Sequence, residues 1–221
     1  MANNGSGSIQ DIRKKFHETH ELISTSYHES GHTIYGLLHF MKIDPVYVFE
    51  NKKTKRIEGF THYESKDIET VSDPELLLER VVSEICFSYA GLAAEKYYFK
   101  LVSGSDKLPM FLRDGSSDDT LYSASLINKY EVSPPGKKRY DYKKKLIRGV
   151  TKELTNNWDA VTLVSHNLFQ KKRLNFYDLK DLLTKKTKNK EFWKEQFKKI
   201  EYIYNSAENV SDHKLKLIFS I

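Results

Sequence analysis

A short motif of two histidines and a glutamate is the feature that most constrains the fold and the chemistry of this chain. Residues 27–32 read Tyr-His-Glu-Ser-Gly-His, so His28, Glu29 and His32 form the pattern H-E-x-x-H. The motif lies in an apolar-periodic run, residues 22–40, which is typical of a helix with one buried face. Residues four positions apart lie above one another on a helix. We therefore expect both imidazoles to reach one metal ion and Glu29 to act on a metal-bound water.

The structural alternative is a helix that carries two ordinary histidines. Apolar positions such as Ile34 and Leu37 give the helix a buried face, and Gly31 leaves room for a neighbouring element, which together favour the metal site. A second pair, His17 and His20, has a chelating i, i+3 spacing. It lacks an apolar frame and a suitably placed glutamate, so we interpret it as an exposed helix end.

The pattern of the whole chain predicts a mainly α (α+β) domain with one small β-hairpin beside the motif helix. Helices are expected at 10–41, about 73–99, 117–130, 142–170, 175–183 and 189–206. Strands are expected at 46–49 and 57–63, joined by a polar turn. We expect a flexible tail at residues 1–9 and a single domain over 10–221, with residues 214–219 forming a strand or a helix end.

Composition narrows the class of protein. The chain has 221 residues, 39% of them hydrophobic, and a net charge of +6. No stretch approaches the roughly 18 apolar residues of a membrane span. The lone Cys86 excludes an internal disulfide and fits a core position in a cytoplasmic protein. Basic residues cluster after residue 137, but no phosphate-binding loop or nucleic-acid motif accompanies them, so we expect solvated helix faces and neither nucleic-acid binding nor membrane insertion.

A catalytic zinc site typically has three protein ligands and one open position. His28 and His32 supply two of them, and the third must come from elsewhere. The acidic candidates are Glu84, Glu95, Asp114, Asp118 and Asp119. Asp118 and Asp119 are favoured because they stand at the start of a predicted helix after a flexible loop, whereas Glu95 is mid-helix. The residues alone do not choose between the two.

Four ordered motifs resemble the peptidase domain of the FtsH-type ATP-dependent zinc metalloproteases. They are Y-H-E-S-G-H at 27–32, G-F-T at 59–61, G-L-A-A-E at 91–95 and G-S-S-D-D-T-L at 115–121, followed by segments 158–168 and 174–182 that resemble the family's closing helices. The chain departs from the family where Asp118 replaces an asparagine. It also has neither a Walker-type G-x-x-x-x-G-K-[ST] string nor a transmembrane segment.

The resemblance implies one Zn²⁺ per chain, held by His28, His32 and Asp119, with Glu29 as the catalytic base. It also implies that Gly59, Phe60 and Thr61 belong to an edge strand that pairs with an extended peptide. Glu95 then orients a ligand histidine, although a helix-packing role fits its position equally well. By the same resemblance, the chain is expected to form a homo-oligomer, a hexamer in the family, or to work with a partner ATPase in trans.

The expected function is therefore a zinc-dependent metalloendopeptidase that hydrolyses peptide bonds in unfolded or flexible protein segments. The first alternative is a zinc-binding but catalytically weak module that acts in regulation or assembly. Another is a different zinc peptidase that cleaves a repressor. The motifs at 91–95 and 115–121 argue against that last alternative.

Overall fold

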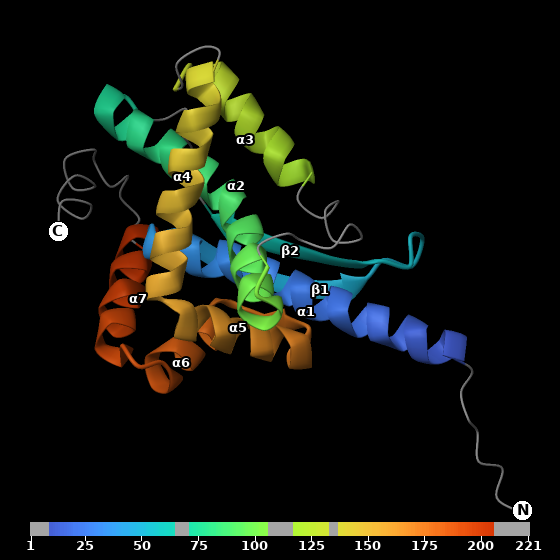
Figure 1. The fold of residues 1–221 in the computed structure, drawn as a ribbon. Helices are drawn as coiled ribbons and strands as arrows, with labels where there is room; N and C mark the ends of the chain where they lie inside the picture. Colours follow the sequence, from blue (N-terminus) through green and yellow to red (C-terminus); the bar gives the residue numbers. More distant parts are fainter. Residues whose placement is uncertain (1–8, 65–70, 106–116, 133–136, 206–221) are drawn as a thin grey trace, which may run out of the picture.

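The computed structural model describes residues 9–64, 71–105, 117–132 and 137–205, which form seven helices and a three-stranded antiparallel sheet (Figure 1). The long helix α1 (Ile9–Leu38) carries the H-E-x-x-H motif and runs across the molecule. The other helices are α2 (Pro74–Ser103), α3 (Ser117–Lys129), α4 (Lys137–Asn156), α5 (Trp158–Lys171), α6 (Phe176–Lys186) and α7 (Lys190–Asn205). The prediction of a mainly helical chain with a small sheet is confirmed.

The predicted hairpin forms beside the motif helix. Strands β1 (Lys42–Glu50) and β2 (Ile57–Glu64) pair antiparallel, with Tyr47 opposite Phe60. A two-residue strand, β3 (Arg173–Leu174), pairs with the other edge of β1 and was not predicted, because two residues carry no readable alternation. The strand order is β2-β1-β3, so β2 is an outer strand of the sheet among the described residues.

Close contact between α1 and α2 places the motif against a second helix. A Cβ atom on Gly31 would lie 2.3 Å from the carbonyl oxygen of Ala90 and 2.7 Å from Cβ of Ala94. Any larger residue at position 31 would push the helices apart, so the predicted role of Gly31 in a close approach is confirmed. This contact brings the faces of α1 and α2 that carry the candidate site together.

The hydrophobic core joins α1 to the C-terminal helices. Ile34, Leu37, Trp193 and Phe197 are buried in one cluster. Gln196 donates hydrogen bonds to the carbonyl oxygens of Leu37 and Leu38, at 2.8 and 3.0 Å, and so supplies side-chain partners to the last two carbonyls of α1. The far end of the motif helix is therefore fixed by the C-terminal part of the chain.

Cys86 is a buried core residue, as predicted. Several helix ends differ from expectation. The predicted helix at 142–170 is two helices, because the chain bends at Asn157, which lies outside helical backbone angles. Helix α2 begins after the capping side chain of Asp73, as expected, but continues past residue 99 to a left-handed Gly104. Asn175 caps α6 in a capping box with Asp178.

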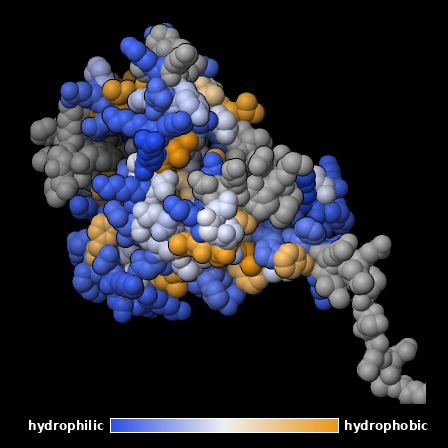
Figure 2. Space-filling model, in the orientation of Figure 1, coloured by the Kyte–Doolittle hydropathy of each residue, from blue (hydrophilic) through white to orange (hydrophobic). Residues whose placement is uncertain are grey.

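The expected tail, except its last residue Ile9, and the segment 214–219 lie outside the described residues. Within the described part of the chain, no helix has the length and apolar character that a membrane span requires. Hydrophilic residues cover most of the face drawn in Figure 2, with hydrophobic residues in small scattered groups. Lys138, Lys144 and Lys145 on α4 are exposed, which agrees with solvated basic faces.

Candidate metal centre

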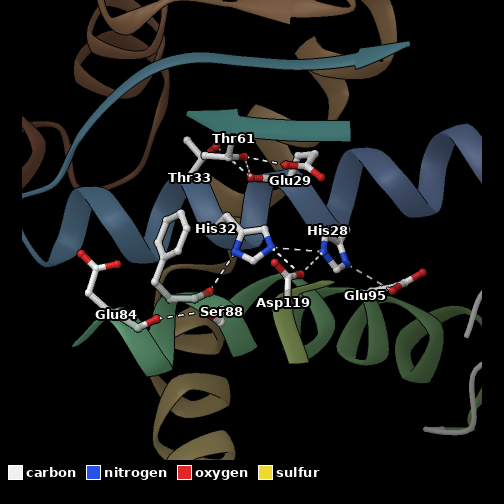
Figure 3. A network of polar contacts seen from close by, with 10 residues as sticks. His28, Glu29, His32, Thr33, Thr61, Glu84, Ser88, Glu95 and Asp119 are labelled. Atoms are coloured by element: carbon white, nitrogen blue, oxygen red, sulfur yellow. Dashed lines mark hydrogen bonds and ion pairs between the residues drawn. The ribbon is translucent and has the colours of Figure 1, made fainter. Parts of the chain in front are cut away.

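Three side chains converge between α1, α2 and the start of α3 (Figure 3). Nε2 of His28 lies 3.1 Å from Nε2 of His32. Oδ2 of Asp119 lies 3.0 Å from the first of these nitrogens and 3.2 Å from the second. The histidines are buried and Asp119 is partly buried. The ligand atoms thus form a nearly equilateral triangle, and the acid that completes it is Asp119.

The triangle fits a small divalent cation. Zinc at its usual bond length to nitrogen and oxygen holds tetrahedral ligand atoms roughly 3.3 Å apart. The two imidazoles point their Nε2 atoms at each other and share one oxygen of Asp119. Hydrogen bonds alone would satisfy these three ligand atoms poorly, whereas one cation would satisfy all of them. Two imidazoles and a carboxylate are also a ligand set that zinc accepts.

Contacts on the far side of each ring fix the two imidazoles. Nδ1 of His32 lies 2.8 Å from the carbonyl oxygen of Phe87, and Nδ1 of His28 lies 3.5 Å from Oε2 of Glu95. Ser24 donates a hydrogen bond to the other oxygen of Glu95. Because Nδ1 faces a fixed acceptor in both rings, Nε2 is turned toward Asp119. Glu95 therefore occupies the position from which a carboxylate orients His28.

The electrostatic surroundings favour positive charge at this point. Burial lowers the pKa of His28, but hydrogen bonds to Asp119 and Glu95 outweigh burial and raise it to about 10. Burial raises the pKa of Asp119, but hydrogen bonds to His28 and His32 outweigh it and hold that pKa well below its usual range. Both shifts have the same origin, since carboxylates and imidazoles meet in a region with little solvent. A cation, either a proton or a metal, is stabilised there.

Gly91 on α2 provides the space for the two rings. A Cβ atom at this position would lie 2.4 Å from Nε2 of both His28 and His32. Atoms at that distance overlap, so any side chain would displace the ligand nitrogens. The glycine in the G-L-A-A-E motif is thus explained by the packing of α2 under the imidazoles.

Glu29 lies beside the triangle and contacts β2 (Figure 3). Its Oε2 accepts a hydrogen bond of 2.6 Å from the hydroxyl of Thr61. A Cβ atom on Gly59 would lie 2.4 Å from Oε1 of Glu29. Gly59 therefore allows the strand to approach the carboxylate, and Thr61 holds one of its oxygens.

A cleft of about 370 Å³ contains the ligands and Glu29. Its remaining lining comes from β2, from Phe87 and Ser88 of α2, and from Asp118 and Tyr122 of α3. Asp118 is exposed, and Phe60 is half exposed. The cleft thus opens one side of the ligand triangle to molecules from solvent.

The remaining predicted acids and histidines lie elsewhere or outside the described residues. Glu84 accepts a hydrogen bond from Tyr63, and Asp114 lies outside the described residues. His17 is exposed, and His20 packs on the ring of Phe16, away from the cleft residues.

Two tyrosines in the cleft were not predicted. Tyr63 and Tyr122 both line it. Strand alternation places Tyr63 on the same face as Thr61, and helical spacing places Tyr122 one turn after Asp119. The spacing of these tyrosines from Thr61 and Asp119 is the sequence signal that indicates them.

No model of a known protein family matches this chain, and no curated protein matches it either. Function is therefore inferred from the geometry of the site and from the motifs in the sequence.

Proposed function

We propose that this chain is a zinc-dependent metalloendopeptidase, similar in its site to the FtsH-type peptidase domain. The observation that carries the proposal is the meeting of His28, His32 and Asp119 within 3.2 Å of one another. Glu29 lies in the same cleft, on the helix that supplies both histidines. A three-ligand site with an adjacent carboxylate and an open side is the arrangement of a hydrolytic zinc centre.

A zinc ion held by His28, His32 and Asp119 would supply the activation of a water molecule and the polarisation of the substrate carbonyl group. The task of Glu29 is to accept a proton from the attacking water and to deliver one to the leaving amine. Thr61 donates to Oε2 of Glu29 and holds that oxygen against β2. Fixing one oxygen also orients the carboxylate, so that it is already in a suitable geometry for proton transfer.

The substrate is proposed to be an extended peptide that pairs with β2. This strand is an outer strand of the described sheet and contributes Gly59 through Tyr63 to the cleft. Backbone groups on such an edge accept a further strand, and alternate side chains of that strand then face the site. Only an unfolded or flexible segment adopts this form, which defines the substrate class.

The motif positions support the FtsH-like assignment of the site. Residues 91–95 lie on α2, where Gly91 lies against both imidazoles and Glu95 contacts Nδ1 of His28. Asp119 stands in the first turn of α3, as the resemblance implied. A hexameric assembly or a partner ATPase in trans stays a prediction from the same resemblance, and a cytoplasmic location stays a prediction from the sequence.

The proposal is tested by measuring zinc content and casein cleavage for the wild type, Glu29→Gln and His28→Ala. Glu29→Gln is expected to keep zinc and lose cleavage, because Glu29 is not in the ligand triangle. His28→Ala is expected to lose both. A wild type that binds zinc but does not cleave casein or any other unfolded substrate would support the catalytically weak regulatory module in place of an active peptidase.

A further inference from the structure

Helices α1 and α2 meet along a row of side chains that includes both motif histidines. Residues four positions apart share one face of a helix. The row takes one such face from each helix, and the two faces run in opposite chain directions. Ser24, His28 and His32 on α1 face Glu95, Gly91 and Phe87 on α2. Ser24 therefore stands one helical turn before the first histidine, at the same interface.

The hydroxyl of Ser24 holds one oxygen of the Glu95 carboxylate. It donates a hydrogen bond to Oε1 of Glu95. The other oxygen, Oε2, lies 3.5 Å from Nδ1 of His28, on the side of the ring away from Asp119 (Figure 3). Ser24 is completely buried and Glu95 is 5% exposed. Solvent has little access to replace a lost donor at this place, so the hydroxyl matters to the carboxylate.

Ser24 uses its hydroxyl differently from the next serine on the same helix. Ser26 is equally buried, and its hydroxyl donates to the carbonyl oxygen of Leu22, four residues earlier, at 2.8 Å. Serines inside helices commonly make this local contact. A hydroxyl has one proton, and Ser24 gives that proton to a side chain of another helix. Ser24 is neither in the ligand triangle nor in the lining of the cleft, so it reaches the centre through Glu95.

We propose that Ser24 is a positioning residue for the metal centre, because it holds Glu95 in the orientation that accepts the Nδ1 proton of His28. This inference rests on the zinc site of the proposed function. A fixed acceptor keeps the proton on Nδ1 and leaves Nε2 to bind the metal. Of the two roles that the sequence left open for Glu95, the contact with Ser24 favours orientation of the histidine. The working motif of this chain is then S-x-x-x-H-E-x-x-H over residues 24–32.

The first test measures zinc affinity and the visible spectrum of the Co²⁺-substituted protein. Outer contacts that orient a ligand typically change metal affinity by about 10- to 100-fold when they are removed, and we expect a loss in this range for Glu95→Gln. Ser24 acts through Glu95, so Ser24→Ala is expected to lose about 3- to 10-fold and to shift the cobalt bands. The double variant is expected to lose no more than Glu95→Gln alone, because both changes act through one contact to His28.

Ser26→Ala is the matched control for the first test. It also removes a fully buried hydroxyl from α1, two residues away, but that hydroxyl contacts only the backbone of its own helix. Zinc affinity and cobalt bands are expected to stay as in the wild type. Equal losses in Ser24→Ala and Ser26→Ala would overturn the proposal, as would a zinc affinity of Ser24→Ala within about twofold of the wild type.

The second test does not depend on a bound metal. Nitrogen-15 NMR of the metal-free protein follows the proton on Nδ1 of His28, whose exchange with solvent reports how firmly Glu95 holds it. Ser24→Ala is expected to accelerate this exchange by about threefold or more, and Ser26→Ala is not. Unchanged exchange in Ser24→Ala would overturn the proposal. A wild type without zinc affinity would overturn the proposed function, and the NMR measurement would still decide whether Ser24 orients His28 through Glu95.

Discussion

The hydroxyl of Thr61 donates a 2.6 Å hydrogen bond to the carboxylate of Glu29. This contact joins β2, an outer strand of the described sheet, to the helix that carries both motif histidines. A peptide paired with β2 would therefore lie beside Glu29, the carboxylate that is proposed to accept a proton from the attacking water. In the proposed function, substrate binding and proton transfer would therefore depend on the same strand.

Removing the Thr61 hydroxyl should disturb the orientation of the Glu29 carboxylate without affecting metal binding. Thr61→Val keeps the shape of the side chain, so we expect zinc to stay bound and kcat for a flexible peptide to fall by about 10-fold. Thr19→Val, an exposed position whose hydroxyl contacts only its own helix backbone, is the control. Steady-state kinetics together with zinc analysis check this. Equal kcat in the two variants would show that the contact has no part in the reaction.

Gly91→Ala should abolish metal binding. The new methyl group would lie 2.4 Å from both ligand nitrogens, so the rings must move, and we expect a loss of stability of about 1–3 kcal/mol in addition to the loss of zinc. Gly149→Ala on α4 is the matched control, because a Cβ atom there meets nothing within 4 Å. That control is expected to gain about 0.5–1 kcal/mol from helix propensity. Urea unfolding and zinc analysis measure both effects, and a zinc-loaded Gly91→Ala protein would contradict the geometry.

Cys86 should be almost inert in the folded protein. Burial raises the pKa of its thiol to about 11. At pH 8 the folded chain therefore has roughly one thousandth of its Cys86 as thiolate, the reactive form. Labelling with a disulfide reagent is expected to be slow in buffer and fast in denaturant, with a rate in buffer that rises as the pH approaches 11. Equal labelling rates in buffer and in denaturant would place Cys86 at the surface.

Phe60 should contribute to peptide binding. Its ring is 49% exposed and lines the cleft on the strand that is proposed to receive the substrate. Phe60→Ala is expected to raise KM by about 3- to 10-fold, which corresponds to the loss of part of one aromatic contact. Phe49 is a similarly exposed aromatic on β1 that does not line the cleft, so Phe49→Ala is expected to leave KM unchanged. A matching rise in both variants would indicate a general effect on the hairpin.

Local signals in the sequence were sufficient for much of the fold. The helical period around the motif predicted α1, and the polar turn between two apolar runs predicted the hairpin. Asn175 predicted the start of α6, which it caps in the structure. In each case the determining contacts lie within a few residues along the chain.

The parts that sequence reasoning missed depend on packing between distant segments. Strand β3 exists only because β1 offers it an edge, and the break at Asn157 interrupts a helical pattern that continues on both sides. The choice of Asp119 over Asp118, which the family resemblance indicated but the residues alone left open, depends on the rotation of α3 against α2, where Leu126 and Ile127 are buried. Spacing along the chain placed both aspartates at the start of a helix but did not give that rotation.

The zinc content of purified protein is the most direct test of the proposed centre. It is to be measured at neutral pH for the wild type, Asp119→Ala and Asp118→Ala, which differ by one position on the same helix. We predict one zinc per chain in the wild type and in Asp118→Ala, and loss of zinc in Asp119→Ala. A wild type without zinc, or a loss in Asp118→Ala with full zinc in Asp119→Ala, would contradict the His28, His32 and Asp119 site.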